Sequence, residues 1–197
     1  METQTAEAPV LGVQIEAIKK VAEGFNKADF NGRLHSEVAE SVARNIVIAE
    51  EEPVKVEGLK VLGNYASATG RDWEYVPQVQ EKVVDQIAAI GQGEPSIPVK
   101  GEALTQIARR FDKADFNGRT HGQAVDAMRK VASSVTVTEQ NSPQAELVNK
   151  AIDRLGAYAS ATGRDWEYVP QVQSKARAAI DYISATAGVA KLTDLKP

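Results

Sequence analysis

Apolar residues recur every three or four positions along most of the chain, a spacing typical of amphipathic α-helices. Asn31-Gly32 interrupts this pattern after the first stretch, since the dipeptide favours the positive φ angles of a turn. The pattern predicts four helices in the first half of the chain. Their apolar positions are Ile15, Ile18, Val21, Val38, Val42, Ile46, Leu59, Leu62, Tyr65, Val76, Val79, Val83, Ile87 and Ile90.

The second half of the chain repeats the first. Residues 25–33 closely match residues 111–119, and residues 62–80 match residues 155–173 at eighteen of nineteen positions. The second copy has seven extra residues between these two segments, and the polar run at residues 133–142 is their predicted place. The apolar face of the fourth helix is kept between the copies, whereas its polar face differs. This pattern indicates one helical unit built twice.

Prolines and glycines refine the expected helix boundaries. Pro53 suits the first turn of the third helix, and Ser142-Pro143 is a predicted cap followed by a first-turn proline in the second copy. Gly70 is expected to end the third helix by adopting a left-handed conformation. The fourth helix is predicted to begin near Val76-Pro77, since proline disrupts the interior of a helix.

These observations predict an all-α protein made of two tandem, internally duplicated helical-bundle modules of about four helices each. The Gly/Pro-rich composition around Pro95 marks the linker between them. The predicted divisions are an N-terminal tail (1–9), a first module (10–92), a linker (93–98), a second module (99–188) and a C-terminal tail (189–197).

Composition narrows the classes of function. The formal net charge is −4, so no basic surplus indicates binding to nucleic acid. Cysteine is absent, which excludes disulfides, thiol nucleophiles and Cys-ligated zinc. The N-terminal segment is acidic and unlike a secretory signal, and no apolar run is long enough to span a bilayer. We therefore expect a soluble cytoplasmic protein without membrane insertion.

Residues with chemically distinctive side chains gather in two turns of each copy, between the first and second helices and between the third and fourth. In an up-down-up-down bundle both turns lie at the same end, so we expect one turn surface per copy. The first turn surface consists of Asp29, Arg33, Arg71, Trp73, Glu74 and Tyr75, and the second of Asp115, Arg119, Arg164, Trp166, Glu167 and Tyr168.

Two interpretations of the turn surfaces stay open. In the first, Trp73 and Tyr75 plug the end of the bundle and Arg71 forms an ion pair. In the second, the surfaces bind a partner, because Trp, Tyr and Arg are enriched in binding hot spots. The recurrence of polar residues, such as Gln80 as Gln173, also favours the second interpretation, since glutamine rarely packs in a core.

The sequence favours no catalytic or metal site. His35 and His121 are the two histidines, and neither has a Ser, Cys or paired carboxylate at a diagnostic spacing. The segment at residues 26–32 and its repeat weakly resemble a calcium loop, but Lys27 and Val38 would stand where that loop requires carboxylates. We therefore expect no enzyme activity, no bound metal and no cofactor.

The function that the sequence favours is a bivalent protein-binding or scaffolding role, in which two equivalent surfaces engage two copies of a partner or a repetitive assembly. Two alternatives from other classes stay open. One is a structural component that self-assembles into homo-oligomers through the same surfaces. The other is a helical carrier that holds a small molecule or ion.

Overall fold

The computed structural model describes residues 7–23, 32–67, 75–109, 118–162 and 167–186. Within these ranges the regular secondary structure is helical and no strand occurs, which confirms the predicted all-α class. The helices are α1 (Glu7–Val21), α2 (Gly32–Ile48), α3 (Glu52–Ala66), α4 (Tyr75–Gly93), α5 (Ile97–Ala108), α6 (Gly118–Ser133), α7 (Pro143–Ala159) and α8 (Val169–Thr186).

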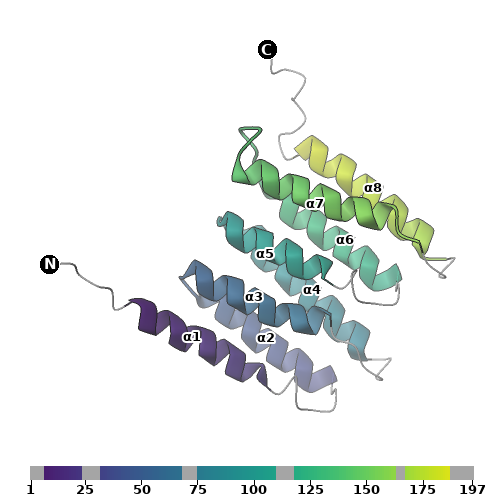
Figure 1. Ribbon diagram of the computed structural model, residues 1–197. Coiled ribbons are helices and arrows are strands. Elements are labelled where there is room, and N and C mark those ends of the chain that lie inside the picture. The colour runs from purple at the N-terminus through teal and green to yellow at the C-terminus, as the bar shows by residue number, and fades with distance from the viewer. Residues whose placement is uncertain (1–6, 24–31, 68–74, 110–117, 163–166, 187–197) are drawn as a thin grey trace.

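The helices form a two-layered stack (Figure 1). The odd-numbered helices lie side by side in one layer and the even-numbered helices in the other, and each helix packs against the next one in its layer. Consecutive helices form antiparallel hairpins, of which each copy contributes two. Such stacked hairpins are the architecture of helical-repeat proteins, in which each unit contacts its neighbours.

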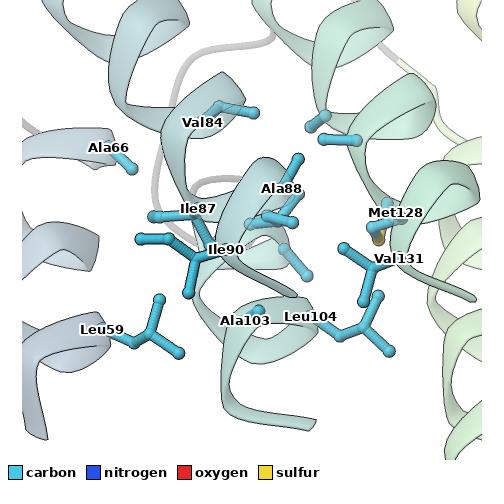
Figure 2. Packing of buried hydrophobic residues seen from close by; sticks show 14 of the residues in the cluster. Leu59, Ala66, Val84, Ile87, Ala88, Ile90, Ala103, Leu104, Met128 and Val131 are labelled. Carbon is cyan, nitrogen blue, oxygen red and sulfur yellow. The ribbon is translucent and has the colours of Figure 1, made fainter. Parts of the chain in front are cut away.

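A single apolar core runs along the stack and across the predicted boundary between the modules. α3 packs on α5 and α4 on α6, so both layers continue from the first copy into the second. The division of the chain into two modules therefore stays a prediction from the sequence. Figure 2 shows the core at this boundary, with labelled side chains from α3, α4, α5 and α6: Leu59, Ala66, Val84, Ile87, Ala88, Ile90, Ala103, Leu104, Met128 and Val131.

Three residues of the predicted apolar stripes are not fully buried: Ile15 and Val38 are partly buried, and Val21 is exposed. Val21 in α1 is 38% exposed, whereas its counterpart Ile107 in α5 is fully buried. The difference follows from position in the stack, since α5 lies between α3 and α7 but α1 is the first helix of its layer. The periodicity identified the apolar face of α1 but not which neighbour would cover it.

Helix starts follow the predicted signals. Pro53 lies in the first turn of α3, and the Ser142 side chain accepts a hydrogen bond from the Ala145 N–H at 3.2 Å, which caps α7. Ser96 caps α5 in the same way through the Val99 N–H. The loop at residues 134–142 separates α6 from α7, in agreement with the predicted place of the seven-residue insertion.

The predicted end of the third helix was wrong. α3 ends at Ala66 and not at Gly70, which lies outside the described residues. The Ser67 hydroxyl donates to the Gly63 carbonyl at 2.8 Å, and Ser160 makes the equivalent bond to Gly156 at 2.9 Å. The backbone N–H of each serine donates to the same carbonyl, at 3.0 and 3.1 Å, so serine closes the last turn with both its backbone and its side chain.

Polar contacts tie α3 to the residue after α4 and to the residue after α5. The Lys55 ammonium pairs with Glu94 at 2.7 Å, where both side chains are only 15% exposed. Arg109, the residue after α5, donates to the Asn64 amide oxygen of α3 at 2.9 Å. In the second copy Ala157 replaces Asn64, and α7 is the last helix of its layer among the described residues, so no described helix supplies the corresponding arginine. Asn64, the one position at which the nineteen-residue repeat differs, thus lies at a contact between α3 and α5 that only the first copy makes among the described residues.

A glycine of the repeat marks the same contact. A Cβ atom at Gly63 would lie 1.7 Å from the Gln106 side-chain oxygen of α5, whereas a Cβ atom at Gly156 would meet nothing within 4 Å. Gln106 is buried and donates to Glu102 at 2.6 Å, so it is held in place. Gly63 therefore allows α5 to approach α3, and Gly156 keeps this small size on a helix face that has no such neighbour.

Alanine substitutions at the two glycines should have opposite effects. We expect Gly63→Ala to lower the free energy of unfolding by about 1 kcal/mol, because Gln106 must move. Gly156→Ala should raise it by about 0.5 kcal/mol, because alanine is the better helix former. Urea denaturation of both variants measures these changes. Equal effects of the two substitutions on the free energy of unfolding would contradict a close approach of α5 to α3 at Gly63.

None of the helices in the described ranges is both long enough and apolar enough to cross a membrane.

Candidate functional site

The predicted turn surfaces fall largely outside the described residues. Asp29, Arg71, Trp73, Glu74, Asp115, Arg164 and Trp166 belong to this group. Arg33, Tyr75 and Arg119 lie in the first turns of α2, α4 and α6, but their side chains are not among those described. Glu167 and Tyr168 precede α8 and both are exposed, Tyr168 by 40%.

The helix ends that flank these turns lie along one edge of the stack (Figure 1). The C-terminal ends of the odd-numbered helices and the N-terminal ends of the even-numbered helices meet there, because every hairpin is antiparallel in the same sense. This edge, where α8 begins next to Glu167 and Tyr168, is the candidate functional site.

The histidines beside this edge are part of the core. His35 and His121 are 3% and 1% exposed. The His35 ring packs on Tyr65 with 6.1 Å between ring centroids, and the His121 ring packs on Tyr158 at 5.8 Å with nearly the same tilt. Burial raises the pKa of Tyr65 to about 12. These aromatic pairs link α2 to α3 and α6 to α7 behind the edge, so their recurrence has a packing explanation.

Gln80 and its counterpart Gln173 have packing roles, against the expectation that they mark a binding surface, whereas the repeated Gln78 and Gln171 are exposed. Gln80 is 2% exposed. Its counterpart Gln173 is partly buried, and its side-chain amide donates to the Ala161 carbonyl at 2.7 Å. Gln173 thus satisfies a carbonyl after the end of α7 and fixes the start of α8 against it. The part of the repeat that packing leaves unexplained is therefore smaller and consists of the turn surfaces together with the exposed Gln78 and Gln171.

No group of three or more His, Asp or Glu side chains that could hold a metal ion occurs among the described residues. The pKa of the Glu40 carboxylate is held below its usual range, because the Lys82 ammonium pairs with it on the surface. Such an exposed pair between α2 and α4 has the character of a solvated ion pair.

A surface groove between α2 and α4 was not predicted from the sequence. It has a volume of about 940 Å³ and is lined mainly by the C-terminal halves of these helices, at the opposite end from the turn surfaces. Val47 and Ile48 on its rim are 62% and 75% exposed. We define the α2–α4 groove by the lining residues Glu40, Ala43, Arg44, Asn45, Val47, Ile48, Gln86, Ala89, Ile90, Gly93 and Glu94.

The repeat contains a signal that could have located this groove. The residues of the second copy that correspond to Ala43 and Ala89 are Arg129 and Tyr182, so two small side chains replace two large ones on facing helices. Where one copy has small side chains and the other has large ones, the surfaces of the two copies differ in shape, and the copy with small side chains has the groove.

Comparison with known proteins gives no assignment: no protein-family model matches the chain, and no curated protein sequence matches it.

Proposed function

We propose that this protein is a non-enzymatic scaffold that binds a protein partner through its two turn surfaces. The observation that carries the proposal is the exposure of Glu167 and Tyr168 at the edge of the stack, in contrast to the burial of Tyr65, Tyr158 and Gln80 in the same repeated segment. Packing accounts for the buried residues, whereas an exposed tyrosine that recurs with a tryptophan and an arginine is typical of a binding hot spot.

The architecture supports bivalent binding. α4 and α8 lie in the same layer and point in the same direction, with α6 between them (Figure 1). Surfaces at the N-terminal ends of these two helices therefore face the same side of the molecule. Two sites held at a fixed separation bind a dimeric or repetitive partner more tightly than either site alone, because the second contact is intramolecular.

The test is quantitative partner capture by Trp73→Ala and Trp166→Ala variants, alone and combined. We expect the double variant to retain at most a tenth of the captured partner and each single variant an intermediate amount, because one surface remains. Tyr182→Ala removes an aromatic side chain that is 47% exposed on α8 away from the edge, and it should capture the partner like the wild type.

Two further measurements distinguish the alternatives. Circular dichroism should show that the double variant keeps its helical signal, and unfolding of this variant would mean that the tryptophans plug the core. Light scattering at the capture concentration should give a monomer, whereas concentration-dependent growth that the double variant loses would favour self-assembly over scaffolding.

A further inference from the structure

The surface that carries the α2–α4 groove has an equivalent surface between α6 and α8 in the second copy. Lys82 pairs with Glu40 across the first pair of helices, and Lys175 pairs with Asp126 across the second at 2.5 Å. These residues occupy the same positions in the repeat, so both helix pairs are joined by the same ion pair. The side chains on the two surfaces can therefore be compared position by position.

The two surfaces differ in what fills the space between the helices. In the second copy the Arg129 guanidinium carbon lies 4.9 Å from the centroid of the Tyr182 ring, which is the geometry of a cation–π contact. In the first copy Ala43 and Ala89 stand at these positions, and the α2–α4 groove is open. The first copy therefore lacks an aromatic ring and a guanidinium that the second copy supplies from its own helices.

We propose that the α2–α4 groove binds an aromatic side chain of a partner protein, which takes the place that the Tyr182 ring has in the second copy. Ala43, Ala89 and the buried Ile90 provide an apolar surface for the ring. Arg44 is exposed and is the basic residue of the lining, so it supplies the cation for the ring face. The lining carboxylates Glu40 and Glu94 are paired with Lys82 and Lys55.

The rim of the groove identifies the source of the aromatic ring as a protein. Val47 and Ile48 are large apolar side chains exposed to water, and their counterparts in the second copy are Ser133 and Ser134. A free aromatic molecule would fill the space between the helices and leave the rim in contact with water. A segment of a partner protein would cover the rim as well, and burial of exposed apolar surface is the expected source of affinity.

The test uses N-acetyl-tyrosinamide and N-acetyl-leucinamide as probes, titrated into the ¹⁵N-labelled full chain and followed by NMR. We expect N-acetyl-tyrosinamide to shift amide signals of α2 and α4 around Ala43 and Ala89, and N-acetyl-leucinamide to bind several-fold more weakly. Ala89→Tyr places a ring in the groove and should weaken probe binding at least tenfold. Asp85→Tyr adds the same side chain to an exposed position of α4 outside the groove and should bind like the wild type.

A gain of binding provides the converse test. The Arg129→Ala/Tyr182→Ala variant reproduces the open groove in the second copy and should add a second set of shifts on α6 and α8. Absence of shifts up to the solubility limit of N-acetyl-tyrosinamide, shifts confined to other helices, equal binding of the leucine probe, or unchanged binding by Ala89→Tyr would each overturn the proposal.

The source of the ring is tested on protein from its natural source. We expect Ala89→Tyr, but not Asp85→Tyr, to lose a captured partner protein. Native mass spectrometry that instead detects a retained small aromatic molecule, lost in Ala89→Tyr, would overturn docking of a protein. The inference is independent of the turn surfaces, so the Trp73→Ala/Trp166→Ala variant should bind the tyrosine probe normally.

Discussion

An alanine in place of Gly91 is expected to lower the free energy of unfolding by about 3 kcal/mol, at the upper end of the cost of overpacking a core. A Cβ atom at this position would lie 2.7 Å from the Cβ of Ala103 and 3.0 Å from a methyl carbon of Val131. The Ala103 Cβ is fixed to the backbone of α5, so no rotation of a side chain relieves the clash. α4 and α5 must move apart, and the packing across the boundary between the copies is lost with them.

Gly93 provides the matched control, since it lies in the same helix and a Cβ atom there would meet nothing within 4 Å. Gly93→Ala should leave stability unchanged or raise it by a few tenths of a kcal/mol through helix propensity. Chemical denaturation of both variants measures the difference in their free energies of unfolding. The dependence of this free energy on denaturant concentration should be the same as in the wild type. If Gly91→Ala proved as stable as Gly93→Ala, the close approach of α4 and α5 would be wrong.

The second large effect is expected at Lys100, which is 4% exposed in α5. Its ammonium donates to the Gly91 and Gln92 carbonyls at 2.9 and 3.2 Å and to the Ser134 hydroxyl at 2.7 Å. It therefore caps the C-terminal end of α4 and links it to the residue after α6. Lys100→Met keeps the apolar part of the side chain but leaves these acceptors unsatisfied, so we expect a loss of about 2 kcal/mol.

The effect of Lys100 should depend on pH. Burial lowers the pKa of the Lys100 ammonium below its ordinary value of 10.5, and the nearby Glu94 carboxylate opposes this shift only in part. The folded protein therefore releases this proton at a lower pH than the unfolded chain does. Between the lowered pKa and 10.5 the unfolded state binds more protons, so the contribution of Lys100 to stability rises with pH in that interval.

Unfolding curves of the wild type and of Lys100→Met across alkaline pH measure this dependence. The stability difference between the two proteins should widen as the pH rises toward 10.5. A constant difference would mean that the ammonium is solvated in the folded state, in conflict with its burial.

The sequence was sufficient for the helices and for one apolar face of each, because periodicity indicates which side of a helix is buried. It was not sufficient for their arrangement. Val83 and Ile87 of α4 are buried, but so are Val84 and Ala88 on a second face of the same helix, against α6. A helix of a closed bundle needs one apolar face, whereas a helix inside a stack needs two. The periodicity alone did not separate these cases.

The candidate site could be predicted only in outline. The repeat identified segments at one edge of the stack, but the assignment of individual residues depended on contacts between helices. His35 and Tyr65 are far apart in sequence and pack together because α2 and α3 are adjacent. Gln80 is buried although its residue type is usually exposed. Such burial depends on the neighbours of a helix, which no local pattern encodes.

The outer faces of α7 and α8 differ in their capacity to accept a neighbouring helix. α7 keeps Gly156, whose equivalent in α3 admits the next helix of the layer, so the odd-numbered layer retains the shape needed to continue. The even-numbered layer does not, since Arg177 and Asp181 of α8 are exposed where α4 has the buried Val84 and Ala88. Two charged side chains of α8 thus occupy the face that corresponds to the second apolar face of α4. Valine and alanine at these positions would give α8 the kind of apolar surface with which α4 packs on the next even-numbered helix.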